Sequence, residues 1–595
     1  MIHFLVIVTP DGSCELRATP EDPAAGQPCA NESQTVQAVI DGRIDNAEEL
    51  VAAFDAAGRP LRARTDAALL LAAYDLWGDG CAERLRGDFA FAIWDAPRRR
   101  LVCARDILGS RPLYVQARGG GIAVASEIAP LLRLPGASRE PNEALLAEYL
   151  NGTIVHRTDT VWRDIDRLLP AHLLMAEGGR VATRCYWQPD PHREVRYRDD
   201  NEYGEHLADL IRSAIRPLVC GRVPFGVMLS GGLDSSSIVG ALHDMALAGP
   251  QRPLPTFSVT TPGEPWDEVE YLDAVTAKWP VTSVRRRHVE GTPEYYAAKT
   301  VAYQDLPPFP NGVMADAMFQ AAADAGVAVL LTGLWSDEWL TGSFLHYTDL
   351  IQQRRFVELW RHFRAQSDRA DGFRPDSLFR SMIWPLVPRP AREVIKRALG
   401  RDGVAPWVNR AFAARTGLPA RIRPAAPPLR FPTRAKTESW TGALGAFSIR
   451  GTELERRTTA GFGIETRHPY ADRRILEFGL ALPEDQRWRG RFPKPALRNA
   501  ARAWLPPAVL ERSTYTGASS VILRAVQGQF AAGLWDNAAS VRQGWVNLPA
   551  LHTAFEEMMG RYRSGGDSYM RLASPLWHAC SVELFARHVL EESHG

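Results

Sequence analysis

Residues 223–248 place a buried strand, a short turn rich in glycine and serine, and an amphipathic helix in direct succession. The turn reads SGGLDSSS and spans residues 230–237. We expect the backbone amides from Gly231 to Ser236 to be unpaired and to point at one location, with the positive end of the helix dipole behind them. Such an arrangement binds an anion, and the glycines let that anion approach the backbone closely. The stretch therefore predicts an anion site where a strand of an α/β domain ends.

An acidic residue inside this turn narrows the kind of anion. Asp234 would repel a bare phosphate, so a cation must lie between them, and Mg²⁺-bound pyrophosphate fits better. Ser230, Ser235 and Ser236 add hydroxyl donors. The chain has no G-x-x-x-x-G-K-[ST] and no G-x-G-x-x-G after a strand, which disfavours kinase-like phosphoryl transfer and dinucleotide binding. The turn is instead similar to the pyrophosphatase loop of enzymes that form adenylates; a plain helix-capping turn is the alternative.

Two further segments supply candidate residues for the same site. The apolar run 327–333 predicts a buried strand, and Asp337 follows its carboxyl end, where open α/β sheets bind ligands. We therefore predict that Asp337 is the second Mg²⁺ ligand, the alternative being a carboxylate that stabilises a helix N-terminus. Lys494 lies between two prolines at a predicted helix start, where a cation is disfavoured. Near the α-phosphate of ATP it would stabilise developing charge; an ordinary surface lysine is the alternative.

The rest of the chain divides into segments of different character. Residues 1–190 carry short apolar or alternating runs between turn residues, which predicts a β-rich domain with few helices. In residues 200–595, continuous apolar runs alternate with long helical patterns, as in a parallel α/β sheet with many helices. Residues 343–440 predict a helical insert that closes in a Pro/Arg-rich loop at 417–436. We interpret the insert either as a structural addition or as a cover over the substrate.

Charge and cysteine content limit the partners and the compartment. The 70 Lys and Arg residues and the 69 Asp and Glu residues give a net charge of +1, without the basic excess that nucleic-acid binding needs. The seven cysteines are scattered and form no C-x-x-C, so neither a disulfide framework nor a zinc site is indicated. The apolar run at residues 4–8 is too short for a membrane span. We expect a cytoplasmic protein without nucleic-acid or membrane partners.

Over nearly its whole length the chain resembles the glutamine-dependent asparagine synthetase superfamily. Six motifs occur in family order: SGGLDSS, FSV at 257–259, DE at 267–268, TGLWSDE at 332–338, E-x-R-x-P-Y-x-D at 465–472 and K-x-x-L-R at 494–498. The resemblance implies ATP as co-substrate, Mg²⁺ bound by Asp234 and Asp337, and Lys494 as the catalytic residue. It also implies nucleotide contacts, with pyrophosphate at Ser230, Gly231, Gly232, Asp234, Ser235 and Ser236 and adenosine at Met228, Val259, Thr332 and Gly333.

The N-terminal segments GDFAFAIWD (87–95), LVCARDILGSRPLYV (101–115) and ASE (125–127) resemble the Ntn-type glutaminase domain of the same superfamily. That domain uses a cysteine directly after the initiator methionine, with its own α-amine as base, whereas position 2 here is Ile2. The family's Asn-Gly-Glu triplet for glutamine corresponds to Asp41-Gly42-Arg43, which lacks the amide and reverses one charge. Cys14 and Cys29 cannot substitute, because the mechanism needs the chain terminus. An inactive domain that supplies no nitrogen is therefore implied.

This loss favours superfamily members in which an amine of the substrate itself attacks the adenylated carboxylate. β-Lactam and carbapenam synthetases carry a tyrosine three residues before the second metal aspartate, but Leu334 cannot transfer a proton. The DEWLTG segment, the ALPEDQRWRG run and the long insert resemble lasso peptide cyclases. We therefore predict an ATP-dependent macrolactam synthetase acting on a short core peptide, with a precursor-processing protease as a partner implied by the family.

Other functions stay open at this point. A small-molecule amide or β-lactam-type synthetase and an ammonia-using asparagine synthetase share the same chemistry. A non-catalytic binding module and a tRNA-modifying adenylating enzyme fit less well, because the candidate residues are intact and the net charge is near zero. The superfamily's R-x-K element after the final Leu-Pro has no lysine here, so either Arg512 is sufficient or that contact is dispensable.

Overall fold

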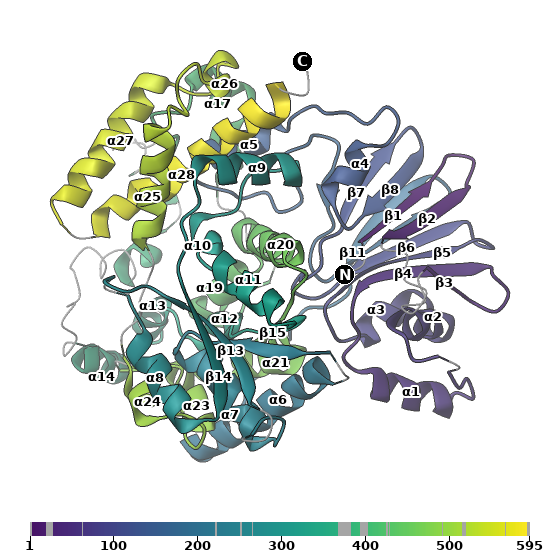
Figure 1. The fold of residues 1–595 in the computed structure, drawn as a ribbon, viewed down its shortest axis with the longest axis horizontal. Coiled ribbons are helices and arrows are strands. Elements are labelled where there is room, and N and C mark those ends of the chain that lie inside the picture. Colours follow the sequence, from purple (N-terminus) through teal and green to yellow (C-terminus); the bar gives the residue numbers. More distant parts are fainter. Residues whose placement is uncertain are drawn as a thin grey trace.

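In the computed structural model, two antiparallel sheets formed by the N-terminal part of the chain lie beside a larger part built on a parallel sheet (Figure 1). The structure describes residues 3–591 except 20–27, 62, 221–222, 250–252, 265, 367–381, 389, 393–394, 396–402, 424–426, 428, 491, 514–518 and 566. A β-rich N-terminal domain followed by an α/β region with many helices is the predicted fold class, and it is confirmed.

The two N-terminal sheets face each other. The first has the strand order β2-β1-β8-β7-β9 and the second the order β11-β10-β6-β5-β4-β3. The bounds are β1 His3–Val8, β2 Cys14–Thr19, β3 Cys29–Ala30, β4 Val36–Gly42, β5 Phe89–Asp95, β6 Arg100–Arg105, β7 Tyr114–Arg118, β8 Gly121–Ala125, β9 Asp166–Arg167, β10 His172–Glu177 and β11 Arg180–Cys185.

Strand β5 explains how this domain is layered, because all of its residues are buried. Ala90 and Ala92 point between the sheets, into a core that also holds residues of β1 and β8. Phe91 and Ile93 alternate to the other face and pack in a core with helix α2 (Asp66–Trp77) and helix α1 (Ala47–Ala56). Helices α1 and α2 cover the outer face of the second sheet (Figure 1).

The parallel sheet has the order β14-β13-β12-β15-β16. Its bounds are β12 Phe225–Met228, β13 Leu254–Thr260, β14 Val281–Arg287, β15 Val329–Leu331 and β16 Glu465–Arg467. Side chains alternate across it: Leu330 packs with helix α11 (Asp316–Asp324) on one face, while Val329 and Leu331 join the main core on the other. Helices α6 (Asp200–Val219) and α7 (Leu233–Asp244) contribute to that main core.

A second large core joins the beginning of the chain to its end. It contains helix α5 (Glu143–Leu150) and Trp162 together with helices α25 (Ser519–Ala531), α27 (Leu548–Arg563) and α28 (Met570–Phe585). The Trp162 ring meets the Phe585 ring edge-on with 5.4 Å between centroids. The Trp162 indole also donates a hydrogen bond to the Gln304 carbonyl at 2.7 Å. The N-terminal part and the C-terminal helices therefore share buried apolar surface.

The predicted insert is helical where the structure describes it. Its helices are α13 Leu345–Gln352, α14 Phe356–Gln366, α17 Arg410–Arg415, α18 Leu418–Arg421 and α19 Arg434–Ala443, with a 3₁₀ turn at Trp384–Leu386. The prediction of a loop across 417–436 is wrong at both ends, because Leu418 is fully buried and anchors α18, while α19 begins at Arg434. Residues 424–426 and 428 of this segment lie outside the described residues.

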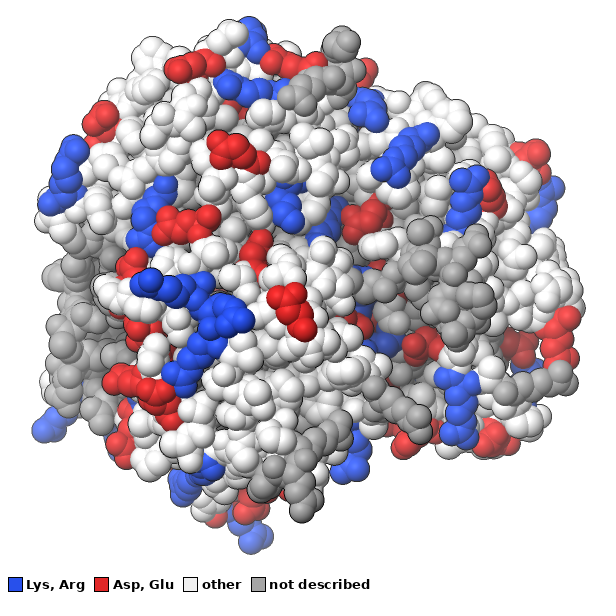
Figure 2. All heavy atoms as spheres, in the orientation of Figure 1, with Lys and Arg blue, Asp and Glu red and all other residues white. Residues whose placement is uncertain are grey.

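Surface charge and helix composition add two observations. On the face in Figure 2, positive and negative side chains are interspersed over the described residues, in keeping with a net charge of +1. Within the described ranges, no helix combines the length and apolar character that crossing a membrane requires.

Candidate active site

The SGGLDSSS turn connects β12 to α7 at the carboxyl edge of the parallel sheet. Gly231 has φ +81°, and a Cβ there would come within 2.9 Å of the Tyr271 Cβ, so glycine is required twice over. The Gly232 amide donates to Ser230 Oγ at 3.2 Å, and the Ser236 amide donates to the Gly232 carbonyl at 3.2 Å. The prediction that all amides of the turn are unpaired is therefore wrong, because Ser236 already lies within the α7 hydrogen-bond ladder.

The serine hydroxyls of the turn have different environments. Ser235 Oγ accepts a hydrogen bond from the Ser230 amide at 3.1 Å, which ties the two ends of the turn together. Ser236 Oγ is buried and has no hydrogen-bond partner among the described atoms. Ser237 bonds to the Tyr470 hydroxyl. The three hydroxyls therefore differ in availability to a ligand, and Ser236 alone of them is recorded without a partner in the described part of the chain.

Lys494 lies between the two predicted metal ligands. Its Nζ donates to both oxygens of Asp234 at 2.6 and 2.7 Å and is 2.8 Å from Asp337 Oδ1. The lysine side chain is only 5% exposed. Burial alone would lower its pKa, but the two carboxylates outweigh that effect and raise the pKa of Lys494, so the ammonium form is retained. Three residues that are far apart in sequence thus form one cation–carboxylate cluster, the Lys494 cluster.

Neighbouring strands explain why the two aspartates converge. Strands β12 and β15 pair in parallel, so the segments that follow them leave the same edge of the sheet. Asp337 belongs to the first turn of helix α12 (Ser336–Leu340), and the preceding Ser336 donates to Asp234 Oδ1 at 2.8 Å. A Cβ at Gly333 would lie 2.8 Å from the Asp234 Cβ, so the two segments are in direct contact there.

The segment from Glu465 to Tyr470 supports both of these turns. The Thr332 amide donates to the Arg467 carbonyl at 3.0 Å, and the Thr332 hydroxyl bonds with His468 Nδ1 at 2.6 Å. The Tyr470 hydroxyl donates to the Asp234 carbonyl at 3.3 Å. Sequence reasoning placed Glu465, Arg467 and Tyr470 in a motif without assigning them roles, and it missed His468 and Ser336. Their positions inside the E-x-R-x-P-Y-x-D motif and directly before Asp337 were the available signals.

The residues predicted to bind adenosine gather at the same edge. Met228 and Val259 lie at or near the ends of β12 and β13 and are partly buried against the core that contains Phe257. Thr332 and Gly333 directly follow β15. The four positions therefore share one rim of the sheet with the Lys494 cluster, although their contacts with a nucleotide remain predictions.

The donor set at this site suits a hard cation. The carboxylates of Asp234 and Asp337 already converge on one positive charge, that of Lys494. Throughout the described residues, no group of three or more His, Cys, Asp and Glu side chains is arranged to hold a metal ion. Mg²⁺ is commonly held by one or two carboxylates together with substrate phosphates, and the pair of aspartates fits that pattern.

The insert is attached to this site through Arg487, which is fully buried. Its guanidinium donates to the carbonyls of Trp339 and Thr341, at 3.0 and 2.9 Å, and to Ser439 Oγ on α19 at 2.8 Å. Thr341 Oγ1 in turn donates to Asp337 Oδ1 at 3.1 Å. One arginine therefore connects helix α19 of the insert to the loop that carries Asp337.

Arg512, the residue considered as a replacement for the missing lysine, contacts the motif at 267–268. Its guanidinium pairs with Glu268 Oε1 at 2.5 Å and lies 4.3 Å from the Tyr271 ring centroid. The side chain is almost fully buried, at 7% exposed. Arg512 thus holds helix α8 (Val269–Lys278), and whether it also contacts a nucleotide stays a prediction.

In the N-terminal domain, the Asp41-Gly42-Arg43 triplet contains a buried arginine that is surrounded by carboxylates. Arg43 donates to Asp45 at 2.8 Å and to Asp88 at 2.7 Å, and it lies 3.5 Å from Glu465. Burial raises the pKa of Cys14 to about 12 and also raises the pKa of Cys29, so neither thiol is a ready thiolate nucleophile. Ile2, at the position of the family's nucleophile, lies outside the described residues.

Comparisons with known families agree with this geometry. A glutamine amidotransferase domain model matches residues 15–187, and an asparagine synthase model matches residues 206–586, more than half of the chain. The chain belongs to the asparagine synthase family. It is accordingly an ATP-dependent, AMP-forming ligase, with an Ntn-like amidotransferase domain preceding the synthase domain.

Several relatives align over both parts of the chain. A Mycobacterium tuberculosis H37Rv protein, whose name is that of a glutamine-hydrolysing asparagine synthetase, is 26% identical over 550 residues, covering 87% of this chain and 80% of the relative. The Bacillus subtilis glutamine-hydrolysing asparagine synthetase 3 is 23% identical over 498 residues, covering 81% and 75%. Amidase chyE of Penicillium rubens is 26% identical over 355 residues, covering 56% and 50%.

Proposed function

We propose that this asparagine synthase family protein is a peptide macrolactam synthetase. It would activate an Asp or Glu side chain of a short core peptide as an acyl-adenylate and join it to the N-terminal amine of the same peptide. The observation that carries the proposal is the contrast between the assembled Lys494 cluster and the N-terminal pocket, where Arg43 is held by carboxylates. An adenylating site without a glutamine-derived nitrogen must take its nitrogen from another source, and in this proposal that source is an amine of the substrate itself.

The chemistry has two balanced steps. In the first, a carboxylate oxygen of the peptide attacks the α-phosphorus of ATP, and the bond to pyrophosphate breaks. In the second, the peptide amine attacks the acyl carbon, loses a proton and displaces AMP. Asp234 and Asp337 would hold Mg²⁺, which neutralises pyrophosphate charge when bound. The Lys494 ammonium, buried and fixed by the chain, would stabilise negative charge around the α-phosphate in both steps.

Positioning would supply much of the rate. An intramolecular reaction between groups held in a near-attack geometry gains on the order of 7–11 kcal/mol. The adenylate must also be shielded from water. The insert is suited to both needs, because Arg487 attaches its helix α19 to the loop that carries Asp337.

An aromatic group near Lys494 supports a peptide rather than a small polar substrate. Phe344 meets Trp488 edge-on at 4.6 Å between ring centroids, and Tyr347 lies 6.3 Å from the Trp488 ring. Trp488 belongs to the short β17–β18 hairpin (Trp488–Arg489 and Phe492–Pro493) that ends directly before Lys494. Phe344 is 43% exposed, so this surface is able to contact apolar side chains of a bound peptide.

The decisive experiment incubates the protein with ATP, Mg²⁺ and a candidate leaderless core peptide, taken from the neighbouring biosynthetic locus. Mass spectrometry should show a peptide lighter by one water, together with stoichiometric AMP. A matched peptide with its acceptor Asp or Glu changed to Asn or Gln should be returned unchanged. If every candidate peptide is unchanged while a small amino acid supports pyrophosphate exchange, the proposal is wrong. A cytoplasmic location and a partner protease that frees the peptide amine are further parts of the proposal.

A second candidate is an ammonia-using asparagine synthetase. The relatives are named asparagine synthetases, which favours aspartate as the activated acid, although their names specify glutamine as the nitrogen source. It would form AMP with aspartate and ammonium and no cyclised peptide. Assaying aspartate with ammonium beside the peptide reaction separates the two candidates.

A further inference from the structure

We propose that the decayed glutamine site now serves as a clamp, in which Arg43 is a positioning residue for the ATP site of the synthase domain. The inference rests on the ATP-dependent ligase activity and not on the identity of the acyl substrate. The clamp consists of Asp41 and Arg43 from the N-terminal domain, Arg456 and Glu465 from the synthase domain, and Arg111.

Both changed residues of the triplet pair across the domain boundary. Asp41 lies 3.2 Å from Arg456, which belongs to helix α20 (Ala446–Gly461). Arg43 lies 3.5 Å from Glu465 on β16, and Arg111 pairs with the same glutamate at 2.6 Å. Both positions where the sequence differs from the family's glutamine triplet therefore contact the synthase domain through charge.

The charges around Arg43 explain why a cation is needed there. Asp45, Asp88 and Glu465 all lie within 3.5 Å of its guanidinium. A glutamate at position 43, as in the family triplet, would add another negative charge to a group that is mostly buried. Burial would raise the pKa of Glu465, but Arg111, Arg467 and Arg43 outweigh it and hold that pKa well below its usual range.

A single short strand connects the clamp to the ATP site. Glu465 begins β16, which pairs in parallel with β15 in the register Val329 to Glu465 and Leu331 to Arg467. The next contacts along the chain reach the site itself, because Arg467 and His468 bind Thr332 and Tyr470 binds the Asp234 carbonyl. A shift of Glu465 would therefore be passed on to both turns that hold the Lys494 cluster.

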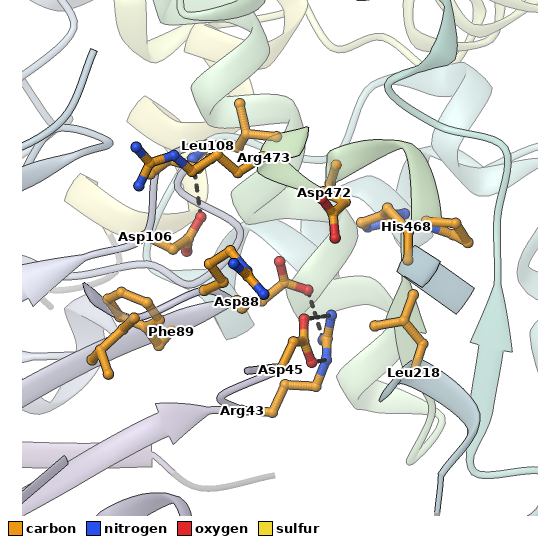
Figure 3. A pocket seen from close by; sticks show the side chains of 17 residues that line it. Arg43, Asp45, Asp88, Phe89, Asp106, Leu108, Leu218, His468, Asp472 and Arg473 are labelled. Carbon is orange, nitrogen blue, oxygen red and sulfur yellow. Dashed lines mark hydrogen bonds and ion pairs between the residues drawn. The ribbon is translucent and has the colours of Figure 1, made fainter. Parts of the chain in front are cut away.

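The pocket that Arg43 lines is also connected to the ATP site through one of its wall residues. Figure 3 shows Arg43 between Asp45 and Asp88, with His468 and Asp472 on the wall contributed by the synthase domain. His468 both lines this pocket and bonds the Thr332 hydroxyl. The former substrate pocket and the ATP-binding rim therefore share a residue.

The test measures ATP binding, which needs no peptide, so it is independent of the macrolactam proposal. The dissociation constant of Mg·ATP is measured by calorimetry on the full chain, for the wild type, Arg43→Met, Arg43→Lys and Arg86→Ala. Arg86 is the matched control, because it lines the same pocket but pairs with Glu49 inside the N-terminal domain. Thermal midpoints of all variants are recorded in parallel.

We expect Arg43→Met to weaken ATP binding about 10-fold, and Arg43→Lys and Arg86→Ala to stay within about twofold of the wild type. A Glu465→Gln variant should weaken binding as well. The double variant with Arg43→Met should be less impaired than the sum of the two, since both remove one contact. Wild-type affinity in folded Arg43→Met, or additive effects in the double variant, would overturn the proposal. If Arg43→Met does not fold, wild-type affinity in Glu465→Gln overturns it.

Discussion

The Lys494 cluster and the Arg43 group, which we define as Arg43 with Asp45, Asp88 and Glu465, each place a buried cation among carboxylates, yet they differ in their exposure to solvent. In the Lys494 cluster the lysine is 5% exposed but its partner Asp337 is 54% exposed, so a ligand can reach the carboxylate and compete for it. In the Arg43 group, Arg43 is 12% exposed and its partners 10 to 20%. A compact ammonium releases its partners more readily than a forked guanidinium does. Exposure and cation type together distinguish a ligand site from a structural lock.

The largest expected effect comes from removing the cation of the Lys494 cluster, the more exposed of the two groups. Lys494→Ala should lower AMP formation at least about 100-fold, because it removes the positive charge from the predicted α-phosphate position. Lys299→Ala on helix α9 (Pro293–Tyr303) is the matched control and should keep wild-type activity. Circular dichroism confirms that both variants are folded. Activity of Lys494→Ala within tenfold of the wild type would contradict the assigned role.

The next largest effect comes from reversing the charge of Arg43 in the more buried Arg43 group. Arg43→Glu should reduce the free energy of unfolding by about 3–5 kcal/mol, because it removes the counter-charge of buried carboxylates. Urea unfolding followed by fluorescence measures the change. Arg43→Lys, which keeps the charge but loses the forked hydrogen bonds, should cost clearly less. Equal free energies of unfolding for Arg43→Glu and the wild type would show that the Arg43 group does not stabilise the fold.

A pH experiment sharpens the comparison, since the Arg43 group holds more carboxylates than cations. Burial raises the pKa of Asp45 from 3.8 to about 6, with Arg43 opposing and Asp88 adding to the rise. The folded state therefore binds the proton more tightly than the unfolded state, and this contribution to stability is lost as the pH rises from about 4 to about 6. Asp45→Asn should remove that part of the pH dependence of unfolding. If the pH dependence of the free energy of unfolding were the same in Asp45→Asn as in the wild type, Asp45 would not be the group responsible for it.

The smallest expected effect concerns the thiols of the N-terminal domain. Cys14→Ala and Cys29→Ala should leave ATP-dependent activity within about twofold of the wild type, because the raised pKa values keep both thiols protonated. Neither the wild type nor the variants should release glutamate from glutamine. If the wild type released glutamate and one of these variants did not, that cysteine would be the nucleophile of an active glutaminase, and the prediction would be wrong.

The sequence predicted the inner part of the parallel sheet and missed its edges. The buried strand predicted at the start of residues 223–248 and the apolar run at 327–333 belong to central strands, and β12 and β15 confirm them. The edge strand β14 ends in three arginines, and β16 has three polar residues, so neither shows the apolar pattern of a buried strand. An edge strand lacks a continuous apolar pattern because it is paired on one side only and is more exposed than a central strand, so it tolerates charged side chains.

The site was predictable in part for a similar reason. Asp234 and Asp337 follow apolar strands, so their meeting could be inferred from strand order. The ion pairs of Lys494 could not, since its Nζ reaches Asp234 across 260 positions of the chain from a residue with φ +57°. The contact of Arg43 with Glu465 spans 422 positions, and from the sequence alone Arg43 indicated only a loss.

The core shared by Trp162, helix α5 and the C-terminal helices makes the synthase part depend on the N-terminal domain for burial of its apolar surface. With this packing, removing residues 1–190 would expose Phe585, which meets Trp162, to water, and the remaining synthase part would be prone to aggregate. This packing gives the synthase part a need for the N-terminal domain that does not depend on glutamine hydrolysis. The N-terminal domain is thus joined to the synthase part through shared buried surface, and we expect the two parts to unfold together.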